Sequence, residues 1–412
     1  MANVSSSNGL EKRPKLRFPG FDEPWKAAHL SDYFAKNIKK NTDGAITNVI
    51  CNSAKQGLIP QRDYFDKDIA NSDNTDGYYI IETNDFVYNP RKSTDAPYGP
   101  ISSYNYPEAG IVSPLYLCFR AKQEINPLYF EWYFRSSAWH RYIYMSGDSG
   151  ARHDRVSIKD DIFFAMPINI PSATEQERIA LFLNAIEQKI DKQRSLVEAL
   201  KKYKRGVISA LLSSKTNPYY SSETWKEVAL CDVASGFEYG MNAAATVYDG
   251  SHKYIRITDI DDNSHLYSQD VPVSPEGQVD EKYRVRENDI LFARTGASVG
   301  KSYRYQRSDG DLYYAGFLIR IHVNSDVNCD YVFQNTLTEA YRRWVLLESA
   351  RSGQPGINAE QYKQYRFLLP PLELQNKIST LATNLDNLIC KEGNLLSQIE
   401  QVKIALLQRL FI

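Results

Sequence analysis

Two stretches of the chain, 174–212 and 373–412, carry the same pattern of hydrophobic and polar positions. In each stretch apolar residues recur at alternating spacings of four and three, which is typical of a coiled-coil helix. The first column is Ile179, Leu183, Ile186, Ile190, Gln193, Val197, Leu200, Lys204, Val207 and Leu211, and the second is Ile378, Ala382, Leu385, Ile389, Glu392, Leu396, Ile399, Lys403, Leu406 and Leu410. The polar exceptions occupy the same two places in both columns, 199 residues apart. This match predicts an internal duplication.

The segments before the two helices predict an α+β fold built from two mixed domains. Trp25-Lys26, Leu30 and Asp32 recur as Trp225-Lys226, Leu230 and Asp232. Alternating apolar runs then predict strands, and the aromatic-rich stretches 129–144 and 331–348 predict one helix in each half. We therefore expect a frayed N-terminus over 1–17, a mixed domain over 18–171, a long helix over 172–213, a second mixed domain over 214–370 and a second long helix over 371–412.

The order of these elements predicts how the long helices pair. The first helix leads from the first domain to the second, and the second helix begins at the second domain. Helices that pack through their apolar columns must then run antiparallel, with the domains at opposite ends of a pseudo-symmetric rod. Gln193 and Glu392 would face each other near its middle and fix the register. The alternative is that each helix packs on its own domain.

Composition limits the class of protein. A chain of 412 residues with 42% apolar content fits two or three soluble globular domains. No apolar run is long enough to span a membrane, and the first residues lack the apolar core of a signal peptide, so we expect a cytoplasmic protein without a membrane partner. The five cysteines form no CxxC pair and lie near no histidine cluster, which disfavours a disulfide framework and a metal site.

The charges are balanced, with 49 Lys and Arg against 50 Asp and Glu. A nucleic-acid-binding protein of this composition would need local cationic clusters, because the whole chain supplies no net positive charge. The balance slightly favours an alternative function, a protein–protein scaffold whose two binding heads are spaced by a coiled coil.

The local motifs do not predict an enzyme. Gly300-Lys301-Ser302 resembles the end of a phosphate-binding loop, but Thr295 stands where that loop requires glycine. Asn89-Pro90 lacks the second proline of an amino-methyltransferase motif, and no glycine-rich turn for its cofactor is present. We find no catalytic residues. The segment around Gly300 is better explained as a turn that presents cations to a partner.

Several short motifs occur in order along nearly the whole chain, and some occur in both halves. They are 18–21 (Phe-Pro-Gly-Phe), 88–91 (Tyr-Asn-Pro-Arg), 110–114 (Gly-Ile-Val-Ser-Pro), 254–257 (Tyr-Ile-Arg-Ile), 294–296 (Arg-Thr-Gly) and 369–371 (Leu-Pro-Pro). Together with the duplicated helices, they resemble the DNA-specificity subunits of type I restriction-modification enzymes. Leu374-Gln375 departs from the Glu-Gln that the family commonly has, which weakens that one motif.

This resemblance implies a non-catalytic subunit. Each mixed domain would be a target-recognition domain that reads half of a bipartite, asymmetric sequence in double-stranded DNA. The helices would set the spacing and dock two copies of a methyltransferase subunit, and motor-nuclease restriction subunits would join for cleavage. S-adenosylmethionine would bind the methyltransferase partner, and ATP and Mg would bind the motor-nuclease partner, so this chain would hold no cofactor. Half-sites on one face of a duplex would lie about one helical turn apart, roughly 34 to 36 Å.

The DNA-binding residues are predicted from cationic loops, because arginine and lysine contact phosphates and arginine can bridge two acceptors on one base. For Arg294, a surface salt bridge is an equally good interpretation. The candidates in the first domain are Tyr88, Arg91, Lys92, Arg152 and Arg155, and those in the second are Arg256, Arg294, Thr295, Lys301, Arg304 and Arg351.

Overall fold

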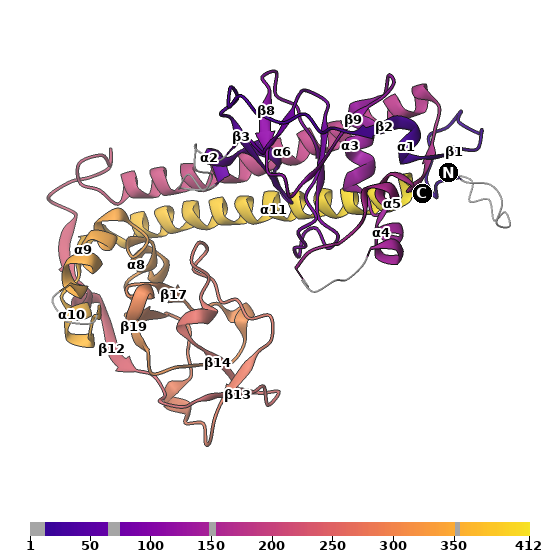
Figure 1. The fold of residues 1–412 in the computed structure, drawn as a ribbon. Helices are drawn as coiled ribbons and strands as arrows, with labels where there is room; N and C mark the ends of the chain where they lie inside the picture. Colours follow the sequence, from indigo (N-terminus) through magenta and orange to yellow (C-terminus); the bar gives the residue numbers. More distant parts are fainter. Residues whose placement is uncertain (1–12, 65–74, 148–153, 351–354) are drawn as a thin grey trace. The chain divides into compact units, whose positions relative to one another are not determined.

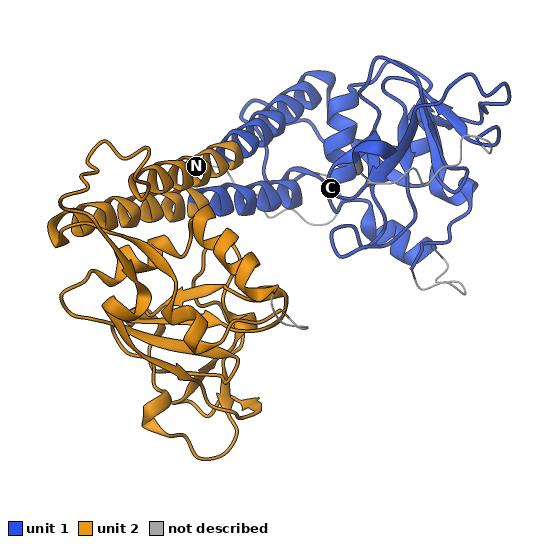
Figure 2. Cartoon of the chain, turned by 90° about the vertical axis from the view of Figure 1, so that its left-hand side faces the viewer, with its two compact units in different colours: residues 1–193, 395–412 blue, residues 194–394 orange. Residues whose placement is uncertain are grey.

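The computed structural model describes residues 13–64, 75–147, 154–350 and 355–412. The chain forms two compact units, one of residues 1–193 with 395–412 and the other of residues 194–394 (Figure 2). Each unit therefore takes in a mixed α/β region and one segment of each long helix. No helix among the described residues is long and apolar enough to cross a membrane.

Unit 1 contains one two-stranded and two four-stranded sheets (Figure 1). The two-stranded sheet pairs β1 (Lys26–His29) with β10 (Pro167–Ile170), and α1 (Leu30–Tyr33) follows β1. One larger sheet has the order β2 (Phe34–Lys36), β9 (Leu117–Ala121), β6 (Phe86–Tyr88), β7 (Ile101–Ser103). The other has the order β4 (Gly57–Pro60), β3 (Val49–Ser53), β8 (Gly110–Val112), β5 (Tyr79–Ile81). The short helix α2 (Gln61–Tyr64) directly follows β4.

Unit 2 repeats part of this plan. β11 (Lys226–Ala229) pairs with β20 (Arg366–Leu369), and α7 (Leu230–Val233) follows β11. The four-stranded sheet has the order β12 (Ala234–Tyr239), β19 (Leu318–Val323), β16 (Asp289–Ala293), β17 (Ser302–Arg304). In place of the second large sheet stand two pairs, β13 (Ala245–Val247) with β15 (Val273–Pro275) and β14 (Lys253–Ile255) with β18 (Leu312–Tyr314). The duplication thus preserved one sheet and its flanking strands while the rest diverged.

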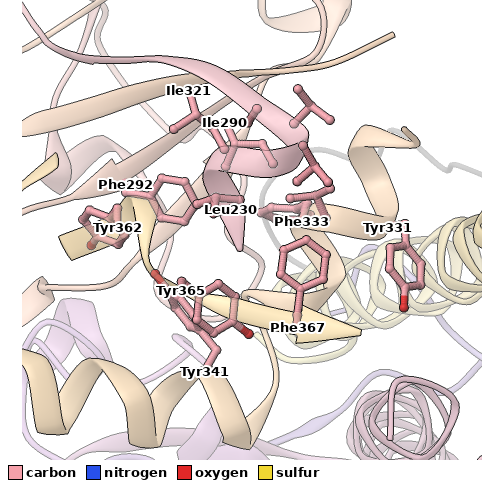
Figure 3. Close-up of a cluster of buried hydrophobic side chains, with 14 of the residues drawn as sticks. Leu230, Ile290, Phe292, Ile321, Tyr331, Phe333, Tyr341, Tyr362, Tyr365 and Phe367 are labelled. Atoms are coloured by element: carbon pink, nitrogen blue, oxygen red, sulfur yellow. The ribbon is translucent and has the colours of Figure 1, made fainter. Parts of the chain in front are cut away.

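Aromatic side chains fill the core of each unit. In unit 1 the ring of Phe34 makes edge-on contacts with three other rings. The centroid distances are 5.4 Å to Phe86, 5.3 Å to Phe119 and 4.9 Å to Phe130. Figure 3 shows the corresponding cluster of unit 2, in which the Phe292 ring lies 4.8 Å from Tyr362. Such large rings dominate core energetics. In each unit these rings share a core cluster with residues of the four-stranded sheet that both units have in common.

The long helices are α6 (Ala173–Leu211) and α11 (Leu372–Leu410), each of 39 residues. In unit 1, Ile179 and Leu183 of α6 share a core cluster with Leu410 of α11. In unit 2, Ile208 of α6 shares a cluster with Ile378 and Ala382 of α11. An early segment of one helix therefore packs with a late segment of the other in each unit. This confirms the predicted antiparallel pairing. In each unit the two helix segments also pack on the mixed region of that unit.

The polar exceptions at Lys204 and Lys403 form ion pairs across the helix pair. Lys403 lies 2.7 Å from Glu187 within unit 1, and Lys204 lies 2.6 Å from Asp386 within unit 2. The two pairs occupy equivalent places in the duplicated helices. Gln193 belongs to unit 1 and Glu392 to unit 2, and their facing each other remains a prediction.

Each predicted aromatic helix is in fact two helices, so the prediction of one helix over 129–144 and one over 331–348 was wrong. Unit 1 has α3 (Pro127–Arg135) and α4 (His140–Ser146), followed by α5 (Asp160–Phe164). Unit 2 has α8 (Cys329–Asn335), α9 (Glu339–Ser349) and α10 (Ala359–Lys363). The Thr338 hydroxyl accepts a hydrogen bond from the Tyr341 amide at 3.2 Å and starts α9 afresh. The aromatic spacing hid the break because both helices face the same core.

Two further predictions need correction. The apolar run 253–260 predicts a single strand, but the strand β14 ends at Ile255. The Asp259 carboxylate accepts from the Arg256 amide at 2.8 Å and starts the 3₁₀ turn η2 (Ile257–Asp259). The N-terminus is also less frayed than predicted. Residues 1–12 lie outside the described residues, but Arg17 contacts the fully buried Glu175 carboxylate at 2.7 and 2.8 Å.

Candidate nucleic-acid interface

Two cationic loops of unit 1 that are distant in sequence lie side by side. The Val156 amide donates to the Pro90 carbonyl at 2.9 Å, and the Lys92 amide donates to the Asp154 carbonyl at 2.8 Å. Arg91 and Arg155 face each other across this short antiparallel ladder. We call residues 90–92 and 154–156 the unit 1 loop pair. It brings together three of the predicted DNA-binding cations.

Unit 2 contains the same ladder at the equivalent place. The Ile357 amide donates to the Arg294 carbonyl at 2.9 Å, and the Gly296 amide donates to the Pro355 carbonyl at 3.2 Å. Thr295 and Gly356 form the facing pair. We call residues 294–296 and 355–357 the unit 2 loop pair. The first segment of each loop pair follows the equivalent strand, β6 or β16, so the backbone site is duplicated while its side chains differ.

The cations of the unit 1 loop pair are weakly neutralised. Arg91 is exposed and Lys92 is half-buried, and neither forms an ion pair with any described residue. The Nε atom of Arg155 lies 3.8 Å from the exposed Asp154 carboxylate, too far for a strong hydrogen bond. Contacts this exposed contribute little stability. The three side chains are therefore available to an anionic ligand.

Gly99 supports the first segment of the unit 1 loop pair. Its φ is +83°, and a Cβ atom there would lie 2.1 Å from the Asn89 carbonyl oxygen. The Asn89 amide donates to the Pro100 carbonyl at 3.0 Å. Only glycine permits this close approach, because other residues would both collide and adopt an unfavourable left-handed conformation.

Tyr88 lies beneath the loop pair. Its side chain is 1% exposed, its hydroxyl donates to the Tyr98 carbonyl at 2.8 Å, and its ring stacks on Phe163 at 5.2 Å. Burial raises the pKa of the Tyr88 hydroxyl well above its usual range. We therefore place Tyr88 among the supporting core residues and leave it out of the proposed contact surface.

Three predicted cations of unit 2 are occupied by carboxylates. Arg256 donates two hydrogen bonds to Asp259, both at 2.8 Å, and this bonding raises the pKa of Arg256. The Arg304 Nε atom lies 2.6 Å from Asp330. Lys301 is 11% exposed, pairs with Asp262 and donates to the Ile260 carbonyl at 2.9 Å. These cations hold loops of unit 2 in place, and their DNA contacts remain predictions.

Arg294 differs from those three. Its guanidinium carbon lies 4.8 Å from the centroid of the Tyr239 ring, and it forms no ion pair with a described residue. Thr295 is half-buried in the loop pair. Arg152 and Arg351 lie outside the described residues. Sequence reasoning missed Tyr239, because a ring that stacks on an arginine 55 positions away leaves no periodic signal.

The described residues contain no group of three or more His, Cys, Asp or Glu side chains that could hold a metal ion. The two loop pairs offer positive charge and hydrogen-bond donors. Guanidinium groups suit phosphate oxygens and the paired acceptors of a guanine edge.

Comparison with known proteins agrees with this chemistry. Residues 222–401 match the family model described as the type I restriction modification DNA specificity domain. This match confirms the resemblance of the chain to the specificity subunits of type I restriction-modification enzymes. The type I restriction enzyme StySPI specificity subunit of Salmonella potsdam is 24% identical over 309 residues, which cover 71% of this chain and 66% of that relative.

A second relative extends the comparison. The putative type I restriction enzyme MjaX specificity subunit of Methanocaldococcus jannaschii is 24% identical over 200 residues, 46% of each protein. The matches thus span about two thirds and about half of the two relatives' lengths.

The fold is that of solved specificity subunits. The S subunit from M. genitalium has a TM-score of 0.54 at 13% identity, covering 97% of this chain and 99% of that chain. The HsdS subunit from Thermoanaerobacter tengcongensis has a TM-score of 0.51 at 16% identity, covering 98% and 99%. A chain from a structure of type I system assembly and conformational transition has a TM-score of 0.60 at 14% identity, covering 96% and 99%.

Proposed function

We propose that the chain is the non-catalytic specificity subunit of a type I restriction-modification enzyme and binds a bipartite, asymmetric target in double-stranded DNA. Each unit would read one half-site. The observation that carries this proposal is the backbone ladder built twice with different side chains, Arg91 and Arg155 in one copy and Arg294 and Thr295 in the other. Two unlike heads of common design suit a target whose halves differ in sequence.

Electrostatics supports the same proposal. The chain has a net charge of −1, so non-specific attraction to DNA would have to arise locally. The unit 1 loop pair concentrates three cations that no strong ion pair with a described residue neutralises. Their spacing on one ladder would let some contact phosphates while others reach a base edge.

The outer faces of the long helices support a partner role. α11 exposes Leu381, Leu388, Leu395 and Val402 at intervals of seven residues, and α6 exposes Phe182, Leu196 and Tyr203 at equivalent places. This second apolar line lies outside the column that packs between the helices and suits docking of partner helices. We propose two copies of a methyltransferase subunit as the occupants, one for each repeat.

The chemistry would then belong to the partners. The methyltransferase subunits would bind S-adenosylmethionine and methylate adenine, and restriction subunits would use ATP and Mg. This chain would direct them to the target and would need no cofactor of its own.

A salt titration tests the proposal. The chain, assembled with its methyltransferase partner, is titrated against fluorescent duplex DNA by anisotropy at several salt concentrations. The logarithm of the affinity should fall linearly with the logarithm of the salt concentration, with a slope of about −0.9 for each phosphate contacted on B-DNA. If the complex binds DNA at none of these salt concentrations, the scaffold alternative is favoured.

A further inference from the structure

The surroundings of Arg294 suggest a more specific role than general attraction to DNA. Its backbone is held from two sides, since its amide donates to the Phe317 carbonyl at 3.1 Å and its carbonyl accepts from the Ile357 amide at 2.9 Å. It directly follows β16, whose five residues are all buried in the four-stranded sheet of unit 2. The Cα position of Arg294 is therefore fixed by the core of unit 2.

The side chain is also oriented. The guanidinium carbon lies 4.8 Å from the Tyr239 ring centroid. That ring is itself fixed, because Tyr239 ends β12 and its hydroxyl accepts a hydrogen bond from the Ala359 amide at 3.2 Å. A planar guanidinium on a fixed ring loses less conformational freedom when it binds than a free side chain would. Tyr239 thus acts as a positioning residue for Arg294.

The donors of Arg294 are not used within the described part of unit 2. Its Nε atom is buried without a hydrogen-bond acceptor there. Arg294 also forms no ion pair with a described residue, whereas Arg256 and Arg304 lie 2.8 and 2.6 Å from carboxylates. The adjoining stretch 351–354 reads Arg-Ser-Gly-Gln and contains no carboxylate. A buried donor without a partner is costly, so a ligand that supplies acceptors would recover that cost.

We propose that Arg294, oriented by Tyr239, reads a guanine in the half-site bound by unit 2. This inference rests on the proposed function. Guanine presents two acceptors, O6 and N7, in the major groove, and a bidentate arginine is the commonest side chain that reads them. An arginine fixed at both backbone and ring suits a base, whose position must be matched, better than a phosphate, which tolerates a mobile cation.

The test measures the sequence preference of the assembled complex on a randomised DNA library, read by sequencing the bound fraction. Arg294→Ala should lower the preference for guanine at one position by about 5- to 150-fold, which corresponds to about 1–3 kcal/mol, and leave the other positions unchanged. Arg294→Lys should lose most of the same preference, because an ammonium lacks the bidentate fork. The lysine variant keeps the charge and the side-chain stem, so it covers the case in which the alanine variant fails to fold.

Tyr239 and a matched arginine complete the design. Tyr239→Leu should weaken preference at the same position as Arg294→Ala, and Tyr239→Phe, which keeps the ring, should weaken it less. Arg342→Ala removes an exposed arginine of α9 that lies 3.7 Å from Glu339, and should leave every position unchanged.

Two results would overturn the assignment. A uniform loss of affinity for all sequences, with a shallower salt dependence, would make Arg294 a phosphate contact. An unchanged profile in Arg294→Ala would remove the residue from the interface. Failure of the proposed function itself would be distinguishable, because the wild-type complex would then show no sequence preference at all.

Discussion

Replacing Arg91, Lys92 and Arg155 together by alanine is expected to weaken DNA binding by the assembled complex at least tenfold and to relax one half of its target. A single base-reading arginine contributes about 1–3 kcal/mol, and every lost phosphate contact makes the salt dependence shallower by about 0.9. The three residues belong to one backbone ladder and form no strong ion pair with described residues, so their removal leaves no buried charge unpaired. Anisotropy at fixed salt measures the affinity, and library sequencing measures the preference.

A matched triple variant separates this effect from net charge. Lys26, Lys40 and Lys122 are exposed residues of the same unit, and replacing them with alanine changes the charge by the same amount. That control should bind DNA with nearly wild-type affinity. Equal losses in both triple variants would mean that the unit 1 loop pair has no special role.

Gly99→Ala is expected to destabilise unit 1 by about 3 kcal/mol or more and to impair DNA binding. The new Cβ would lie 2.1 Å from the Asn89 carbonyl oxygen and 3.1 Å from the Pro90 carbonyl carbon, at a φ of +83°. Left-handed strain alone costs about 1–3 kcal/mol, and the collision with backbone adds to it because neither atom can rotate away. Differential scanning calorimetry should show a transition lowered by about 6 °C or more.

Gly44→Ala provides the matched control. Gly44 also has a positive φ, +65°, but a Cβ atom there would meet nothing within 4 Å. It should show the conformational strain alone, a loss of about 1–2 kcal/mol, with DNA binding intact. If both variants unfold at the same temperature, the close approach of residue 99 to Asn89 does not shape the unit 1 loop pair.

The duplication could be predicted from the sequence because its strongest part is periodic. The heptad columns persist over most of each 39-residue helix, and the polar exceptions recur in register. The Trp-Lys starts likewise mark β1 and β11. Periodicity did not reveal the break between α8 and α9, since Thr338 caps a new helix without disturbing the aromatic spacing.

The candidate site could be predicted only in part, for a physical reason. Charge and turn residues identified Arg91 and Arg155 separately, but the ladder that joins them arises from hydrogen bonds between segments more than sixty residues apart. Which cations are neutralised also depends on three-dimensional contacts, as with Lys301 and Asp262. Arg256 and Asp259 are an exception, because a spacing of three residues is a local signal that sequence reasoning could have used.

The central claim is that each unit reads its own half of one DNA target. The most direct test maps methyladenine across the genome of cells that carry the native chain, the variant with Arg91, Lys92 and Arg155 replaced by alanine, or no chain. The native chain should produce a split motif with a fixed spacer, absent without the chain. The variant should relax one half while the other half and the spacer stay unchanged. A map in which both halves change together, or in which deletion of the chain changes nothing, would contradict the account.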